Sequence, residues 1–132
     1  MWKNVVGSLT LEADAQILKE LCVMQVVANG LATVCTVDAV DFVGVTLEDG
    51  DSAAPFAVPI QFSGIARCQS NGAAAMNPRD QVALAAAGQV KTRAIADGAT
   101  NRTIIGRCLS IAAATANLIV YVQLHPFHIF ST

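Results

Sequence analysis

The residues that could do chemistry are few and widely separated. The two histidines, His125 and His128, stand three apart in the C-terminal segment HPFH. The proline between them disfavours a helix that would bring both rings to one face, and two ligands are too few for a structural zinc site. The acidic run EDGD at 48–51 lacks the alternating aspartates and the distal Glu of a calcium loop. We therefore predict that the chain holds no metal and no cofactor.

Four cysteines stand far apart and form no CxxC pair: Cys22, Cys35, Cys68 and Cys108. The chain opens without a secretory signal, because Glu12 and Asp14 come before any long apolar run. We therefore expect buried free thiols in a protein made in a reducing cytoplasm. A catalytic cysteine is the alternative, and it would need an exposed thiol in electropositive surroundings. With no phosphate-binding glycine motif either, we predict that the chain is not an enzyme.

The composition favours a surface that is partly covered by other copies of the chain or by another protein, and a compact Ala-rich domain is the alternative. Of the 132 residues, 54% are hydrophobic and only 14% are charged, whereas about 25% is usual for charged residues. The net charge is −2, and the eight Lys and Arg are scattered from Lys3 to Arg107. Nucleic-acid binding needs clustered cations, so we expect no nucleic-acid partner. No uncharged apolar run reaches the length of a membrane span, so we also expect no membrane partner.

The distribution of apolar and turn-forming residues predicts that the chain has three parts. Residues 1–11 are expected to form an extended N-terminal arm, and residues 125–132 a C-terminal tail. Between them, residues 12–124 are expected to form a single β-rich domain. Within it, the apolar spacing of EADAQILKELCVM predicts one short amphipathic helix over 12–24, with an extended strand from Leu21 onward as the alternative.

The rest of the chain reads as short strands separated by turns. Asn29-Gly30 lies between two apolar runs and predicts a two-residue type I′ hairpin. A second hairpin is expected at Gly88, and LIVYVQL at 118–124 is the strongest strand signal. Many short strands with frequent turn signals predict an all-β (mainly β) chain, a small β-barrel or tulip-like domain.

Two segments of the sequence echo each other. DFVGVTLEDG at 41–50 and NRTIIGRCLS at 101–110 both place two apolar residues before a Gly and a Leu three positions after it. Gly44 and Gly106 differ by 62 residues, as do the Val-rich strands that follow, and the hairpin turns before them differ by about 58. We therefore predict an internal pseudo-repeat of two similar half-barrels. The two glycines should mark a sharp bend or a close approach of another backbone.

The order of the motifs over residues 40–124 resembles the capsid cement (head decoration) proteins of tailed bacteriophages. A GV-x-L strand at 44–47 is followed by a V-x-x-x-x-x-G strand at 58–64, and Arg79-Asp80 precedes Val82. An A-D-G turn at 96–98, I-x-G-R-x-L at 104–109, an alanine-rich turn at 112–116 and V-x-V-x-L at 120–124 complete the pattern. Arg79 stands where that family usually has Gly, and both chain ends lie outside the matching region.

The resemblance implies a soluble chain made in the host cytoplasm that becomes a virion component on the outer capsid surface. Its partners would be the phage major capsid protein and itself, as a homotrimer that cements neighbouring coat subunits. Val5 to Leu9 could add a strand to a coat-protein sheet. Large apolar residues near the two ends are the predicted capsid or inter-subunit contacts: Trp2, Val5, Val6, Leu9, Phe127 and Phe130. The alternatives are a tail- or fibre-associated attachment module, and an oligomeric ligand-binding barrel.

Overall fold

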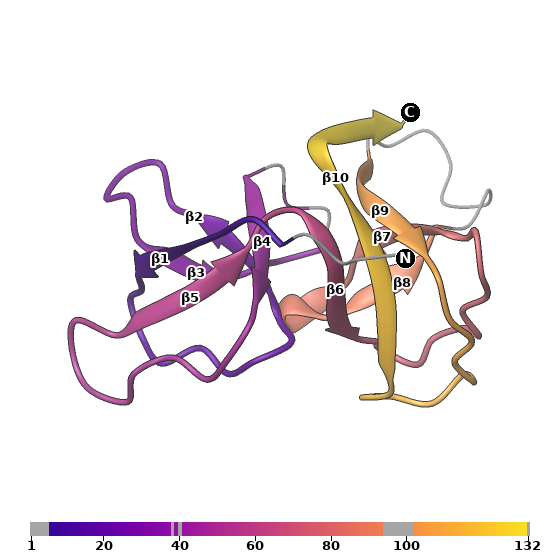
Figure 1. The fold of residues 1–132 in the computed structure, drawn as a ribbon, viewed down its shortest axis with the longest axis horizontal. Coiled ribbons are helices and arrows are strands. Elements are labelled where there is room, and N and C mark those ends of the chain that lie inside the picture. Colours follow the sequence, from indigo (N-terminus) through magenta and orange to yellow (C-terminus); the bar gives the residue numbers. More distant parts are fainter. Residues whose placement is uncertain (1–5, 38, 40, 94–101, 132) are drawn as a thin grey trace.

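The computed structural model describes residues 6–37, 39, 41–93 and 102–131 of the chain (Figure 1). This part contains two antiparallel five-stranded sheets and one 3₁₀ turn, η1 (Ala86–Gly88). The first sheet contains β1 (Ser8–Glu12), β2 (Cys22–Gln25), β3 (Ala32–Val34), β4 (Phe42–Thr46) and β5 (Ala57–Gln61). The second contains β6 (Gly64–Gln69), β7 (Gln81–Leu84), β8 (Val90–Thr92), β9 (Arg102–Cys108) and β10 (Ile119–Ser131). The all-β prediction is therefore confirmed.

The two sheets repeat one topology, which confirms the predicted pseudo-repeat. The first sheet has the order β1-β5-β4-β2-β3 and the second has β6-β10-β9-β7-β8, the same order with five added to each number. All ladders within each sheet are antiparallel. Figure 1 shows the two halves side by side, with β1–β5 in one and β6–β10 in the other.

Gly44 and Gly106 hold equivalent places in the two sheets. Each lies in the strand after the hairpin, β4 or β9, and each ladder to that hairpin shifts its register at the same point. A Cβ on Gly44 would lie 2.2 Å from the carbonyl oxygen of Gln61, and one on Gly106 would lie 2.0 Å from that of Gln123. Glycine is required at both places because a neighbouring backbone fills the side-chain position. The predicted close approach is confirmed.

Each sheet curls until its two edges meet at one end. In the first half, Ala13, just after β1, forms a parallel bridge with Ala32 of β3. In the second half, Ser70, just after β6, forms the equivalent bridge with Val90 of β8. Since β1 and β3 are opposite edges of one sheet, the bridge turns that sheet into a small, partly closed barrel. The chain therefore forms two small, partly closed barrels, one from each half, rather than one barrel built from two half-barrels.

The two barrels share their larger core. Cys22, Phe42 and Val45 of the first half pack with buried side chains of β6–β10, whereas Val58 and Ile60 belong to a separate, smaller cluster inside the first barrel. Gly88 of η1 donates its backbone N–H to the carbonyl oxygen of Cys35, 3.0 Å away. The halves are therefore joined by apolar packing as well as by the chain.

The predicted helix over 12–24 is wrong. After β1 the chain runs in an extended connection, Glu20 adopts a positive φ of 67°, and β2 begins at Cys22. Backbone bonds tie this connection to the strand beside it: Gly50 N–H donates to Ile17, and Thr46 N–H donates to Leu21. Ile17 is buried in the first barrel. The helix-like spacing of apolar residues thus reflects side chains that an irregular connection buries. The strand that begins just after Leu21 matches the alternative prediction of an extended strand from Leu21 onward.

The predicted arm and tail are only partly separate from the domain. β1 pairs along its whole length with β5, and β10 continues to Ser131 with its backbone paired to β9. Residues 8–11 of the arm are therefore sheet, as is the backbone of 125–131.

The turn at Asn29-Gly30 joins β2 to β3 as predicted, but only Gly30 has a positive φ. Val26 N–H donates to Leu31, so the loop is longer than a two-residue type I′ turn.

Among the described residues, no helix has the length and apolar character that crossing a bilayer would demand.

Candidate functional site

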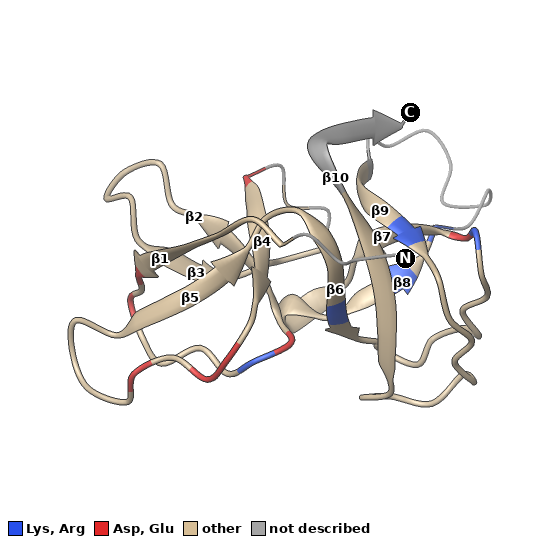
Figure 2. Cartoon of the chain, in the orientation of Figure 1, with Lys and Arg blue, Asp and Glu red and all other residues tan. Residues whose placement is uncertain are grey.

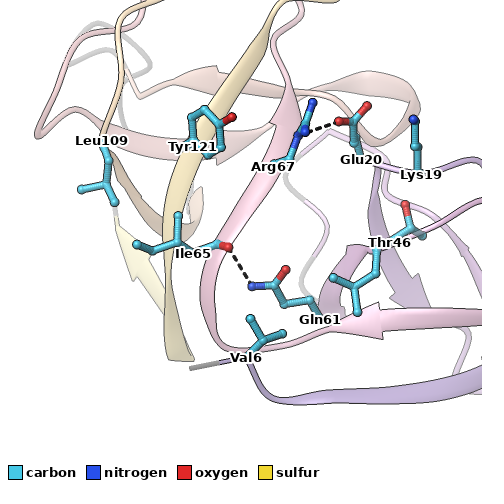
Figure 3. A pocket seen from close by; sticks show the side chains of 10 residues that line it. Val6, Lys19, Glu20, Thr46, Gln61, Ile65, Arg67, Leu109 and Tyr121 are labelled. Atoms are coloured by element: carbon cyan, nitrogen blue, oxygen red, sulfur yellow. Dashed lines mark hydrogen bonds and ion pairs between the residues drawn. The ribbon is translucent and has the colours of Figure 1, made fainter. Parts of the chain in front are cut away.

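A cleft of about 720 Å³ lies at the junction of the two halves (Figure 3). Its walls come from the connection before β2, from β4 and β5 of the first half, and from β6, β10 and the residue after β9 of the second half. Ten residues line it: Val6, Lys19, Glu20, Thr46, Leu47, Gln61, Ile65, Arg67, Leu109 and Tyr121. The cleft therefore exists only because the two half-barrels pack together.

The apolar part of the cleft is built from the repeat. Leu47 and Leu109 follow the two glycine strands at equivalent places, and each donates its backbone N–H across the sheet, to Pro59 at 3.0 Å and to Tyr121 at 2.8 Å. Their side chains are 40% and 46% exposed, and Tyr121 is 44% exposed. Large apolar side chains that stay this exposed around one concavity are typical of a surface that another molecule covers.

One ion pair bridges the cleft from one half to the other. Arg67 Nε of β6 lies 2.9 Å from Glu20 Oε2, and the two side chains are 58% and 11% exposed. In Figure 3 the Arg67 guanidinium meets Glu20 near Lys19, at one end of the cleft. The deeper carboxylate is thus neutralised, while most of the Arg67 side chain stays open to solvent.

The uncharged polar groups of the cleft already have partners within the chain. Gln61 Nε2 donates to the carbonyl oxygens of Ser63 and Ile65, both at 2.9 Å. Thr46 Oγ1 donates to Leu18 at 2.7 Å and accepts from the N–H of Leu21 at 3.1 Å. These bonds hold the cleft walls in place.

The outer edge of β1 is an open strand edge. Gly7 accepts a bond from Phe62 N–H, and Ala13 donates to Phe56, so the odd-numbered residues of this strand face β5. Because hydrogen-bonding direction alternates along a strand, the backbone groups of Ser8 and Thr10 face away from β5. Beyond them the edge closes on β3, where Ala13 bridges Ala32. The side chains of Ser8 and Thr10 are exposed. A short edge of this kind can accept another strand.

The predicted contact residues fall in three groups. Val6, 39% exposed, lines the cleft, and Leu9, 40% exposed, lies on β1. Trp2 and Val5 lie outside the described residues. The backbone positions of Phe127 and Phe130 belong to β10, but their side chains lie outside the description. The structure therefore shows Val6 and Leu9 at solvent-facing surfaces, and all six contacts stay predictions.

Sequence reasoning missed the rest of the cleft. Leu47 and Leu109 end the two echoing strands, so the repeat itself was a signal that they hold matching places. Ile65, Arg67 and Tyr121 alternate with buried neighbours on β6 and β10, which predicts an outward face but not a concave one. The concavity depends on how the second barrel packs against the first.

The four cysteines are buried free thiols, as predicted. A hydrogen bond with Cys68, followed by burial and the nearby thiols, raises the pKa of Cys22 well above its ordinary value. Burial raises the pKa of Cys35 to about 12. Neither of these two thiols is a thiolate at neutral pH. In the part of the chain that the structure describes, no cluster of three or more His, Cys, Asp or Glu side chains could hold a metal ion.

The chain resembles a solved structure, although comparisons by sequence find no match. No protein-family model matches the chain, and no curated protein matches it. Among solved structures, the fold is similar to the N-terminal base of the head fibre gp8.5 of bacteriophage phi29. The TM-score is 0.64 at 10% identity, and the match covers 95% of this chain and 98% of that chain. At this identity the likeness shows a shared fold over nearly the full length of both chains.

Proposed function

We propose that this chain is a structural protein of a bacteriophage particle, and specifically a cement protein. It binds the outer surface of the capsid and ties neighbouring major capsid protein subunits together against the pressure of packaged DNA. The observation that carries the phage assignment is the full-length fold likeness to a phage head fibre base. The motif order over residues 40–124, which resembles cement proteins, carries the finer assignment.

The cementing action would come from several modest contacts acting together. A trimer that spans several coat subunits makes each later contact at a high effective concentration, so the whole clamp is far stronger than one interface. The exposed apolar residues of the cleft and the open edge of β1 supply such contacts on this chain. In this proposal the chain is not an enzyme and needs no cofactor. It is made in the host cytoplasm and binds neither nucleic acid nor membrane.

A second candidate function is the base of a head fibre, a module that attaches a longer appendage to the shell. The specific observation in its favour is that the similar solved structure is described as such a base. The two functions differ in effect. A cement protein occupies many equivalent points and makes the shell more resistant to heat, whereas a fibre base only has to stay attached.

The test is to mix the purified chain with expanded shells of its own phage that lack it. Saturating occupancy on the outside, with a higher temperature of shell rupture, supports cementing. Occupancy without a change in rupture temperature supports a fibre base, and no binding at all overturns both. The predicted arm contacts are tested by deleting residues 1–5, because a longer deletion would remove β1, which begins at Ser8. The matched control is Val27→Asp in the β2–β3 turn, where Val27 is 86% exposed.

A further inference from the structure

A row of four residues crosses the first sheet where the first half packs against the second. Cys22 of β2 pairs with Val45 of β4, and Val45 pairs with Gln61 of β5. The backbone N–H of Cys35 donates to Cys22 at 2.9 Å. All four residues are at most 4% exposed. The three apolar members belong to the core that the two halves share, and the Gln61 amide donates to Ile65 of β6. This row is therefore the face of the first barrel that the second barrel covers.

The same row recurs in the second sheet with different residues. Gln81 of β7 pairs with Arg107 of β9, and the backbone N–H of Arg93 donates to Gln81 at 2.9 Å. Arg107 pairs in turn with Gln123 of β10. Strand order and register therefore match the two rows residue by residue: Cys35 with Arg93, Cys22 with Gln81, Val45 with Arg107, and Gln61 with Gln123.

The second row is open to solvent, unlike the first. Gln81, Arg107 and Gln123 are exposed, and Arg93 is partly buried. Figure 2 shows basic segments on β6, β8 and β9 of the second half. The face by which the first barrel packs is thus repeated in the second barrel. There the described part of the chain leaves it uncovered, and two arginines replace a cysteine and a valine.

The guanidinium groups of this row have no carboxylate partner. Arg93 and Arg107 form no ion pair with any residue that the structure describes. Arg93 Nη1 makes a long bond of 3.4 Å to Gln81 Oε1, and Arg93 Nε is buried with no hydrogen-bond partner in the described part of the chain. Because an unpaired buried donor is costly, this row suits a partner that supplies acceptor oxygens.

Arg79 adds a third cation beside the row. It is the counterpart of Glu20, since both have a positive φ, 75° and 67°, and each donates its backbone N–H to the end of the glycine-containing strand, β9 or β4. Glu20 is buried at the junction, whereas Arg79 is exposed and has no ion pair among the described residues. The adjacent Asp80 carboxylate already accepts the backbone N–H of Asn77 at 2.9 Å. The second barrel therefore carries a base where the first carries an acid.

We propose that this arginine face binds an acidic segment of the major capsid protein; the face consists of Arg79, Gln81, Arg93, Arg107 and Gln123. Guanidinium groups bind carboxylates through pairs of parallel hydrogen bonds. The Gln123 amide donates to a backbone carbonyl of that segment, as Gln61 does to Ile65 within the chain. An apolar occupant like the one that covers the first row is excluded, because it would bury the arginines without partners.

The surroundings of the face favour a polypeptide over a nucleic acid. Leu109 and Tyr121 lie two residues from Arg107 and Gln123, so strand alternation places them on the same side of the sheet. They are 46% and 44% exposed, and such side chains match apolar residues rather than a phosphate backbone. The chain as a whole has a net charge of −2, which opposes the approach of a polyanion. The inference names the partner surface for the proposed cementing function and rests on that function.

The first test measures co-sedimentation of full-length variants with expanded shells that lack the protein. Arg107→Glu should weaken binding at least tenfold, because attraction becomes repulsion. Arg107→Lys should have a smaller effect, since it keeps the charge but loses the two-bond geometry. The matched control combines Ala113→Glu with Ala114→Glu, which makes the same change in net charge at exposed residues of the turn before β10. This control should bind like wild type.

A thermal melt checks that each variant is folded. Arg79→Glu gives a second, independent reading from a turn outside the strands, and it should also weaken binding at least tenfold. Glu20 shows that a glutamate accepts the same positive φ. Shells that bind wild type, Arg107→Glu and Arg79→Glu equally well would overturn the inference and leave the proposed function standing. A wild-type chain that ignores the shells would overturn the proposed function itself.

The occupant is identified by carbodiimide cross-linking of Arg107→Lys on the shells. This reagent joins a carboxylate to the introduced amine as an amide and takes up the water that is released. A cross-link to an Asp or Glu of the coat protein is the expected result. A cross-link to a second copy of the chain instead would overturn the assignment. So would tight binding of a single-stranded DNA oligonucleotide by wild type that Arg107→Glu abolishes, because the face would then serve a nucleic acid.

Discussion

Replacing Gly106 by Ala should destabilise the protein more than almost any other single-methyl change. The added Cβ would lie 2.0 Å from the carbonyl oxygen of Gln123 and 2.8 Å from its carbonyl carbon. Both atoms are backbone of β10, so no side-chain rotation relieves the clash. β9 lies between β10 and β7, and separating it from either partner strains the ladders of the second sheet.

The magnitude follows from the size of the required shift. Overpacking a rigid interior costs about 1–3 kcal/mol and occasionally more. A backbone neighbour at 2.0 Å must move by about 1.4 Å to reach the 3.4 Å of ordinary contact, which places this change at the upper end, about 3 kcal/mol. For a chain of this length that corresponds to a drop in melting temperature of about 10 °C.

The assay is chemical denaturation followed by far-UV circular dichroism, with Gly44→Ala measured beside Gly106→Ala. The repeat predicts similar losses, because a Cβ on Gly44 would meet the Gln61 carbonyl oxygen at 2.2 Å. Gly50→Ala is the control, since its nearest atoms lie at 3.1 Å and the residue has no positive φ. A free energy of unfolding for Gly106→Ala within about 1 kcal/mol of wild type would refute the reasoning.

Three further predictions concern the thiols and the cleft. Cys35 should contribute a loss of about 1.4 kcal/mol in stability per pH unit as pH rises from about 9 toward 12, because the unfolded thiol then ionises while the folded thiol, with its raised pKa, stays protonated. Denaturation at stepped pH should therefore show a loss that is shallower by this amount in Cys35→Ala than in wild type. All four thiols should react with a disulfide reagent at the rate of global unfolding, because all are buried, and fast labelling of one thiol in the native protein would revive the catalytic alternative. Glu20→Gln should cost no more than about 1 kcal/mol in a thermal melt, because Arg67 is largely exposed and water screens the pair, and a larger loss would show that the pair is effectively buried.

The sequence predicted the repeat better than it predicted the connections. Gly44 and Gly106 could be matched to each other from the sequence because only glycine fits at either position. At both, a neighbouring backbone fills the place that a Cβ would take. The strand before each of them could also be placed, since turn residues and β-branched runs are local signals. The connection around Ile17 could not be predicted, because its buried apolar residues happen to follow the spacing of an amphipathic helix.

The cleft was beyond sequence reasoning for a different reason. Its lining residues come from both half-barrels, and their meeting depends on packing between Cys22, Val45 and the second core. Val6 and Leu9 were predicted as contacts from their place near the N-terminus, and the structure gives them surfaces on the cleft and on an open strand. The tertiary arrangement that forms those surfaces follows from no single motif in the sequence.

The repeated topology also bears on the order in which the chain folds. Every strand ladder that the structure describes joins strands of the same half, so β1–β5 can pair completely without any residue after Gln61. These pairings are still non-local, since Ser8 of β1 pairs with Gln61 of β5, 53 residues later, so each half should fold at the slower rates typical of β proteins. The first barrel also has a small core of its own, whereas the second completes its core with Cys22, Phe42 and Val45. We expect the N-terminal half to form first and to act as the template for the other. Pulsed hydrogen exchange during refolding would show protection in β4 and β5 ahead of β9 and β10, and the reverse order would contradict this.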